Sequence, residues 1–264
     1  MKEINIDWIN IKYETYWNNK NKTILILHWR NGSSKSWTKI GNILSNNFYI
    51  IIPNIPCASS IIENCNRNYT LDDYASLINK LINKLKLKDI ILLWHSNWWA
   101  IATKLITSYN NNIKTLILNN SAGIRNTTKK QLKKKLLYIL SKIFKIFFLL
   151  PWTKKIKKLF YKIIWAHDYL NAQENMYKKQ TFLNMIKEDL KNIFPKIKIK
   201  TFLIRWEKDT YTPLSDWILI NKLIKNSKLI VINDAKHWIH LQNPEKLAKV
   251  IFSITKNTNK CLIK

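Results

Sequence analysis

Glycine is almost absent from this sequence, with 3 residues among 264, where average usage of about 7% predicts roughly 18. Tight turns depend on glycine because it lacks a Cβ and tolerates positive φ. Tryptophan, by contrast, occurs 12 times. A fold that joins many strands to helices by tight turns would therefore have to place other residues at its turn positions.

Cysteine, long apolar runs and a signal sequence are also scarce or missing. Cys57, Cys65 and Cys261 are an odd number at scattered spacings, which excludes the usual metal-ligand motifs and favours free thiols in a reducing cytoplasm. The longest apolar stretches are too short to span a bilayer. Residues 1–7 lack the basic-then-apolar pattern of a signal peptide. We therefore expect a cytoplasmic protein without a metal site.

Acidic residues are few, since 16 aspartates and glutamates stand against 45 lysines and arginines, a formal net charge of +29. Such an excess is typical of proteins that bind nucleic acid or anionic lipid. Lysine, asparagine and isoleucine are abundant along the whole chain, however, and AT-rich codons encode all three. A coding bias explains the charge without a polyanion site, and no nucleic-acid-binding motif accompanies it. We expect no specific nucleic-acid partner.

What the sequence does contain is an alternation of strand and helix patterns. Residues 4–16 alternate in the manner of a β-hairpin, whereas residues 124–194 are lysine-rich and helical in pattern. The expected fold class is α/β, a mostly parallel sheet with helices on both faces and an inserted helical cap. Residues 1–122 and 198–264 form the two parts of the expected core, and residues 123–197 form the cap. The expected strands span residues 23–28, 48–53, 89–93, 113–118, 200–205 and 228–232, and the helices span 36–44, 70–85, 97–109, 213–224 and 244–254.

A serine follows the apolar strand at 89–93, where the next helix is about to begin. Segment 94–99 reads Trp-His-Ser-Asn-Trp-Trp. Its context is that of a nucleophile elbow, Gly-x-Ser-x-Gly, but tryptophan stands at both glycine positions, Trp94 and Trp98. The segment resembles the Gly-His-Ser-Asn-Gly-Gly elbow of the α/β-hydrolase family, with Trp99 at the third glycine. The resemblance covers residues 5–122 and 198–255 and implies that Ser96 is a catalytic nucleophile.

An elbow serine needs a histidine base and an acid that orients the histidine. In the α/β-hydrolase family the acid and then the histidine follow the serine along the chain. The resemblance assigns the acid to Asp209, after the strand at 200–205, and the base to His237, after the last strand. The alternatives are a helix-capping role for Asp209 and His240 as the base.

The resemblance also implies an oxyanion hole made of two backbone N–H groups, those of Arg30 and Asn97. Arg30 lies in segment 28–32, which resembles the family's His-Gly-x-x-Gly loop. His28 is expected to support that loop by hydrogen bonding, and Trp29 occupies a glycine position. Cys57, in the loop after the strand at 48–53, stands at another family glycine.

The genetic code offers one explanation for tryptophan at so many glycine positions. UGA encodes tryptophan in some codes and glycine in at least one other, so a glycine-UGA gene translated with a tryptophan-UGA table would give this pattern. The alternative is that the indoles are real and the protein is a catalytically dead hydrolase. Trp37 is the best candidate for a true tryptophan, and Trp152 and Trp217 stay undecided. We expect glycine in the native protein at Trp8, Trp17, Trp29, Trp94, Trp98, Trp99, Trp165, Trp206 and Trp238.

These residues together predict a serine hydrolase that cleaves a carboxylic ester or related acyl substrate through an acyl-enzyme intermediate, with no metal or organic cofactor. Carbon–carbon bond hydrolysis by the same triad and a dead binding protein are the alternatives. Residues 133–164 mix lysine with apolar residues at helical spacing. This pattern indicates a lid packed on the core or, alternatively, a basic amphipathic helix that makes weak contact with anionic membrane.

Overall fold

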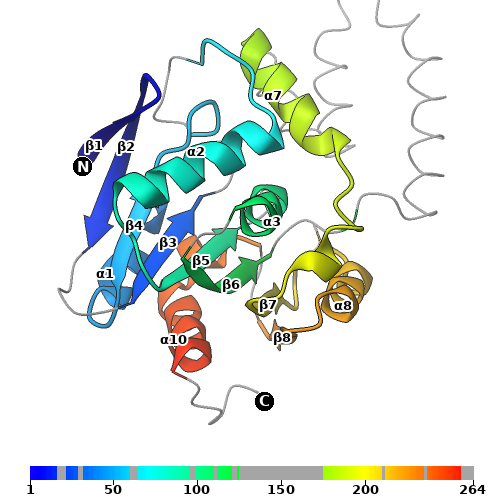
Figure 1. Cartoon of the computed structure of the whole chain (residues 1–264). Helices are drawn as coiled ribbons and strands as arrows, with labels where there is room; N and C mark the ends of the chain where they lie inside the picture. Colours follow the sequence, from blue (N-terminus) through cyan, green and yellow to red (C-terminus); the bar gives the residue numbers. More distant parts are fainter. Residues whose placement is uncertain are drawn as a thin grey trace, which may run out of the picture.

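The centre of the protein is an eight-stranded sheet in the order β1-β2-β4-β3-β5-β6-β7-β8 (Figure 1). A computed structural model of the chain describes residues 1–16, 22–28, 32–59, 65–95, 99–109, 112–120, 124, 175–209, 212–234 and 237–256. β1 pairs antiparallel with β2 and β2 with β4, and the later pairings are parallel. The strands are β1 (Lys2–Ile6), β2 (Ile9–Tyr16), β3 (Thr23–Leu27), β4 (Tyr49–Pro53), β5 (Ile90–His95), β6 (Ile113–Asn119), β7 (Lys200–Trp206) and β8 (Ser227–Ile232).

Helices cover both faces of this sheet (Figure 1). The helices form two groups, one on each face of the sheet. One face packs against the apolar sides of the first group, and the other face packs against those of the second group. The central parallel strands are therefore apolar on both sides, as sheets covered by helices require. The first group is α2 (Leu71–Lys84), α3 (Trp99–Ser108) and α8 (Leu214–Leu223), and the second is α1 (Thr38–Leu44) and α10 (Pro244–Thr255). Shorter or outlying elements are η1 (Ser34–Trp37), α7 (Met176–Lys187), η4 (Phe194–Lys196) and α9 (Ile239–Gln242).

The predicted fold class is confirmed, and each predicted strand and helix of the core lies within two residues of its expected bounds. The start of α2 shows why the sequence was informative. The Thr70 hydroxyl accepts a hydrogen bond from the Asp73 backbone N–H, and the Asp73 carboxylate accepts one from the Thr70 N–H. This reciprocal pair satisfies two backbone donors that a helix start leaves without partners. Of the expected cap, the structure describes only residue 124 and residues 175–197, which include α7 and η4.

The turn between β1 and β2 places a tryptophan in a backbone conformation that suits glycine. Asp7 has φ 46° and Trp8 has φ 68°, so both central residues of this two-residue hairpin lie in the left-handed region. Such a turn favours Asp-Gly or Asn-Gly, and a residue with a Cβ is disfavoured there by about 1–2 kcal/mol. The Trp8 side chain gains no packing in return, because the residue is 96% exposed. Position 8 therefore has the backbone conformation in which glycine is usual.

The interpretation of the cysteines as free thiols is wrong for two of the three. Cys57 and Cys65 form a disulfide across eight positions of sequence, which closes the loop after β4. Cys261 lies outside the described residues. Spacing could not reveal the pair, because the loop has to fold back before the two sulfur atoms meet. Cys57 has φ 56°, the region that favours the glycine expected there.

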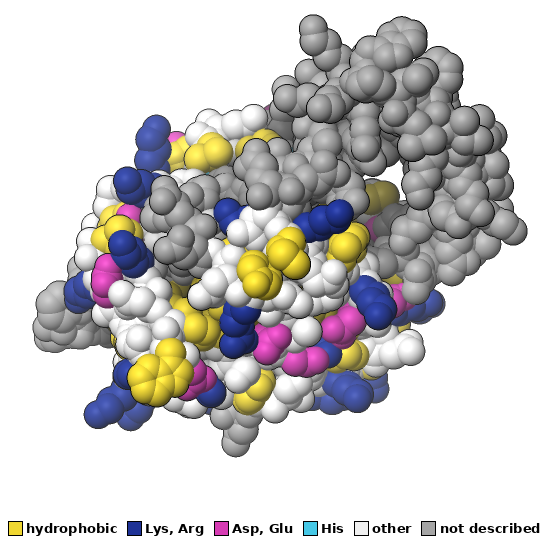
Figure 2. Space-filling view, turned by 90° about the horizontal axis from the view of Figure 1, so that it is seen from above, with side chains coloured by type: hydrophobic (Ala, Val, Ile, Leu, Met, Phe, Trp, Pro, Cys, Tyr) yellow, Lys and Arg dark blue, Asp and Glu magenta, His cyan; other side chains and the backbone are white. Residues whose placement is uncertain are grey.

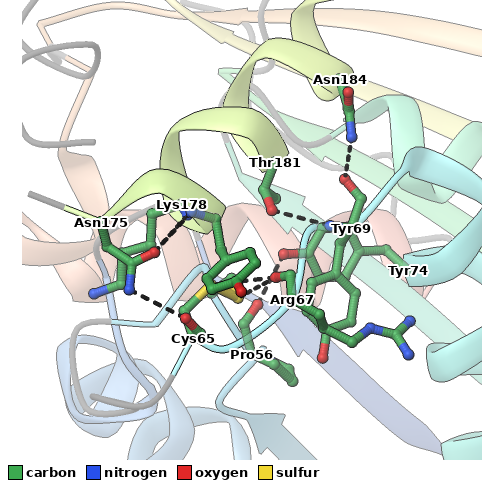
Figure 3. Close-up of a disulfide and its surroundings, with 11 residues drawn as sticks. Pro56, Cys65, Arg67, Tyr69, Tyr74, Asn175, Lys178, Thr181 and Asn184 are labelled. Carbon is green, nitrogen blue, oxygen red and sulfur yellow. Dashed lines mark hydrogen bonds between the residues drawn. A yellow bond between two sulfur atoms is a disulfide. The ribbon is translucent and has the colours of Figure 1, made fainter. Parts of the chain in front are cut away.

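The disulfide loop is also attached to α7 by hydrogen bonds (Figure 3). The Asn175 side-chain amide donates to the Cys65 carbonyl at 3.1 Å, and the Asn184 amide donates to the Tyr69 carbonyl at 3.2 Å. The Tyr69 N–H donates to the Thr181 hydroxyl at 3.0 Å. Two regions more than 100 residues apart in sequence are thereby joined next to the carboxyl end of β4.

Lysine and arginine side chains are scattered over the face shown in Figure 2, with acidic and uncharged residues between them. This dispersion fits an excess of lysine that arises from composition. In the part of the chain that the structure describes, no helix combines the length and the apolar character needed to cross a membrane.

Candidate active site

Three strand ends and the segment after β8 meet at the carboxyl edge of the parallel sheet. β5 ends at His95, β6 at Asn119 and β7 at Trp206. His237 lies beyond β8, in the turn before α9. Ligands of open parallel sheets bind at this edge because loops and polar groups gather there. Two of the three expected triad residues, Asp209 and His237, lie here.

Asp209 and His237 form a buried hydrogen-bonded pair. The distance from His237 Nδ1 to Asp209 Oδ2 is 3.0 Å, and the side chains of His237 and Asp209 are 6% and 0% exposed, respectively. The Thr212 hydroxyl donates to the same carboxylate oxygen at 2.7 Å. With Nδ1–H bound to the carboxylate, Nε2 is the basic nitrogen of the ring. The pair is thus arranged as a base and its orienting acid.

The strand that precedes the expected nucleophile ends beside this pair. The His95 ring centroid lies 5.1 Å from that of His237, and α3 begins only four residues later, at Trp99. β5 is therefore followed by a helix after only three residues, which is the spacing from strand to helix that an elbow requires. Ser96, Asn97 and Trp98 themselves lie outside the described residues.

The loop expected to complete the oxyanion hole, residues 28–32, is described only at its two ends, His28 and Gly32. Trp29 and Arg30 lie outside the described residues, whereas His28 is fully buried at the end of β3. Its Nε2 accepts a hydrogen bond from the Ile55 N–H at 3.3 Å. His28 therefore connects the end of β3 to the loop that contains Cys57.

A cluster of rings, most of them buried, lies beside His237, and little in the sequence indicated it. His95 lies 4.7 Å from His240 between ring centroids, and Trp37 stacks on His240 at 4.6 Å with an interplanar angle of 11°. Trp238 approaches His237 edge-on at 4.8 Å. His240 is thus packed among rings behind His237, and the histidine bonded to the Asp209 carboxylate is His237.

Burial keeps the two inner histidines neutral. It lowers the pKa of His240 to about 3, and the nearby His237 contributes in the same direction. Burial likewise lowers the pKa of His95 well below its usual range, with smaller contributions from His240 and His237. Two neutral rings beside His237 add no positive charge that would oppose its protonation during a reaction.

We expect the free energy of unfolding to fall as the pH drops below about 6.5, the pKa of a histidine in an unfolded chain. Below that pH the unfolded chain binds protons at these two positions, whereas His95 and His240 in the folded protein stay neutral. The contribution of the two neutral histidines to the free energy of unfolding is therefore fully present above pH 6.5 and is lost toward pH 3. Each histidine contributes a slope of about 1.4 kcal/mol per pH unit. Urea unfolding at several pH values measures it. His240→Phe keeps a ring against Trp37 and should lower the slope by the contribution of one histidine. An unchanged slope would contradict the claim that neutral His240 contributes to the pH dependence.

Bulky indoles occupy the core next to the site. Trp94, Trp99 and Trp206 are 0–1% exposed. The indole N–H of Trp206 donates to the Asn119 side-chain oxygen at 2.7 Å, whereas those of Trp94 and Trp99 have no hydrogen-bond partner in the described part of the protein. A buried donor without a partner costs about 1–3 kcal/mol. The indole N–H of Trp37 also lacks a hydrogen-bond partner among the described residues. An unpartnered indole N–H therefore does not by itself distinguish a true tryptophan from a position where glycine is expected.

A cavity of about 300 Å³ lies at the opposite, amino-terminal edge of the sheet. Its lining includes Lys22, Lys114, Lys200 and one carboxylate, that of Asp89. The cavity does not adjoin Asp209 or His237 and is not the candidate site. Among the described residues, no group of three or more histidine, cysteine, aspartate or glutamate side chains could hold a metal ion.

Comparison with known proteins is consistent with this architecture. Residues 133–244 match a family model described as alpha/beta hydrolase fold. The sequence matches none of the curated proteins with which it was compared.

Solved structures similar to the chain cover nearly its whole length. A membrane phospholipase A described as a bacterial virulence factor has a TM-score of 0.72 at 16% identity, over 98% of this chain and 86% of that one. An esterase from Exiguobacterium antarcticum has a TM-score of 0.69 at 20% identity, over 94% and 96% of the two chains. MenH from S. aureus has a TM-score of 0.68 at 20% identity, over 93% and 98%. At these identities the likeness establishes the fold alone.

Proposed function

We propose that this chain, which has the α/β-hydrolase fold, is a serine hydrolase that cleaves carboxylic esters or related acyl substrates through an acyl-enzyme. The observation that carries the proposal is the buried 3.0 Å hydrogen bond between His237 and Asp209. A second observation supports it, because the His95 ring, which directly precedes Ser96 in sequence, lies 5.1 Å from the His237 ring.

In the proposed first step, the Ser96 hydroxyl oxygen adds to the carbonyl carbon of the ester. His237 Nε2 takes the hydroxyl proton, and the carbonyl oxygen becomes an oxyanion. When the tetrahedral intermediate collapses, the bond between the carbonyl carbon and the alcohol oxygen breaks. His237 returns the proton to the departing alcohol, which leaves an acyl group on Ser96.

In the second step, water adds to the acyl-enzyme as His237 removes one of its protons. The ester bond to Ser96 then breaks, Ser96 regains a proton from His237, and the carboxylic acid departs. Asp209 remains ionised throughout and stabilises the imidazolium that forms in each step. The backbone N–H groups of Arg30 and Asn97 are proposed to bind the oxyanion.

The substrate class rests on chemistry and on analogy. Serine hydrolysis of an ester needs no metal or redox group, and the residues at the carboxyl edge supply the acid–base pair that it does need. The esterase and the phospholipase A with the same fold are named for ester-cleaving activities. These names favour an ester substrate for this chain.

The proposed chemistry also requires an elbow with room for a carbonyl group. We propose glycine at positions 94, 98 and 99 in the functional protein, since the elbow turn is strained and side chains on either side would crowd it. The positive φ of Trp8, at a turn position where glycine is usual, supports the interpretation that glycine codons of the gene were translated as tryptophan.

A fluorophosphonate probe tests the function directly. Such a probe forms a bond from phosphorus to an activated serine oxygen and releases fluoride. We expect mass spectrometry to find one label, on the peptide that contains Ser96, in protein made with glycine at the elbow positions. Ser96→Ala and His237→Ala should each abolish the label, whereas serines outside the site should stay unmodified. No label on Ser96 in the glycine form would contradict the proposal and favour a binding protein without catalytic activity.

A further inference from the structure

Asn120 connects three parts of the candidate site and has no role in the proposed reaction. It follows the last residue of β6, is fully buried, and has φ 44°, a region that asparagine tolerates better than other residues with a Cβ. Its side-chain oxygen accepts a hydrogen bond from the backbone N–H of Trp206 at 3.1 Å. Its side-chain amide donates to the backbone carbonyl of His237 at 3.2 Å.

We propose that Asn120 is a positioning residue, which fixes the backbone of His237 while Asp209 fixes its ring. The proposal rests on the proposed function, in which His237 is the base. His237 lies in the turn between β8 and α9, and its carbonyl accepts the Asn120 hydrogen bond there. The Asn120 amide and the Asp209 carboxylate therefore hold His237 at two points, from the segments that follow β6 and β7.

The side-chain amide of asparagine is well suited to this bridge. One partner, the Trp206 N–H, is a donor, and the other, the His237 carbonyl, is an acceptor, so the orientation of the Asn120 amide is determined by its surroundings. A carboxylate of the same shape could accept from the N–H but could not donate to the carbonyl. Because both partners are backbone groups, the bridge is the same whether position 206 is tryptophan or glycine.

The neighbouring asparagine has a different kind of partner. The Asn119 side-chain oxygen accepts from the Trp206 indole N–H at 2.7 Å, and its side-chain amide lies 3.2 Å from His95 Nδ1. These contacts depend on side chains, one of which belongs to a proposed glycine position. Of the two asparagines, Asn120 is thus the one that binds His237, the proposed base.

The test compares Asn120→Ala and Asn120→Asp with Asn112→Ala in the form of the protein whose Ser96 is labelled. Asn112 lies just before the start of the same strand, and its side chain donates to the Leu87 carbonyl at 3.2 Å, so the control also loses one hydrogen bond to a carbonyl but at the far edge of the sheet. We expect kcat for ester hydrolysis to fall about 10- to 100-fold in both Asn120 variants, since a misplacement of about 1 Å can cost about 100-fold. KM should change little, and Asn112→Ala should retain its rate.

The pH profile separates positioning from a merely structural role. In Asn120→Asp, a new carboxylate beside the His237 segment should favour the protonated imidazole and move the acidic limb of the kcat profile to higher pH. Asn120→Ala lowers kcat without that displacement. If the loss in both variants appeared in KM alone, or matched that of Asn112→Ala, the inference would be wrong.

Proton NMR of His237 keeps the inference testable when activity is absent or a variant is weakly stable. In folded Asn120→Ala, we expect the Nδ1–H resonance of the His237–Asp209 hydrogen bond to shift or broaden, because the ring loses its fixed backbone. An unchanged resonance together with unchanged labelling of Ser96 overturns the inference and leaves the proposed function intact. Absence of labelling in the parent protein instead overturns the proposed function.

Discussion

Glycine at positions 94, 98, 99 and 206 together is expected to raise kcat/KM for a small activated ester by about 1,000-fold or more over the chain with tryptophan. Loss of a single oxyanion-hole donor costs about 100- to 1,000-fold in kcat, and indoles that forced the elbow open would displace both the proposed nucleophile, Ser96, and the proposed N–H donor next to it. The described indoles at Trp94, Trp99 and Trp206 are buried in the core, and the Trp206 indole contacts Asn119 at the carboxyl end of β6. A chromogenic ester assay on both forms measures the gain.

The thermal stability of the two forms is a second test, because the two hypotheses predict changes in stability of opposite sign. If the indoles are native, removing buried tryptophans leaves cavities that cost about 3–5 kcal/mol each, and the glycine form should scarcely fold. If glycine is native, its form should unfold at the higher temperature. Trp37→Gly is the matched control, because Trp37 is fully buried against His240 and should lose stability under both hypotheses. If the gene has UGG codons at these positions, the hypothesis that glycine UGA codons were translated as tryptophan is refuted, and no protein needs to be made.

Asp209→Asn and His237→Ala are each expected to lower kcat by about 10,000-fold with little change in KM. The asparagine amide no longer favours the tautomer in which Nδ1 carries the proton, and loss of the imidazole removes the base. Steady-state kinetics on the form whose Ser96 is labelled, with an ester of short acyl chain, measures both. The expected pattern, a fall in kcat at constant KM, reports an interaction made only in the transition state.

Two controls sharpen this prediction. Asp234→Asn removes an exposed carboxylate that pairs with Lys208 at 2.8 Å near the same segment, and it should leave the rate within about twofold, because exposed ion pairs contribute little. His240→Ala distinguishes the alternative base, since it should cost far less than His237→Ala. A larger loss at His240 than at His237 would reverse the assignment of the base.

The fold was predictable because its signals are local. Strands that are buried on both faces appear as apolar runs, and the capping box of Thr70 and Asp73 marks the start of α2 within a few residues. Asp209 and His237 could be singled out by the resemblance to the α/β-hydrolase family. The structure brings the two together because each comes after a strand of the sheet, and the loops after parallel strands gather at one edge. Ser96, Arg30 and Asn97 stay predictions, since the structure does not describe them.

Other features were not predictable because they depend on contacts between distant segments. The amide of Asn120 binds the backbone carbonyl of a residue 117 positions away, and a backbone carbonyl has no signature in sequence. The stack of Trp37 on His240 joins residues from η1 and α9 in the same way. Cys57 and Cys65 looked unpaired because spacing alone does not show how a loop folds back.

The direct pairing of β6 with β7 has a consequence for how this protein could change over evolution. Asn119 lies opposite Ile204, and the Asn120 N–H donates to the Ile204 carbonyl at 3.0 Å, so the sheet continues from one strand to the next although the chain between them is long. The number of residues that connect β6 to β7 can therefore change over evolution while the strand ladder that precedes Asp209 is conserved. Selection could then vary that connection without rebuilding the Asp209–His237 pair at the carboxyl edge of the sheet.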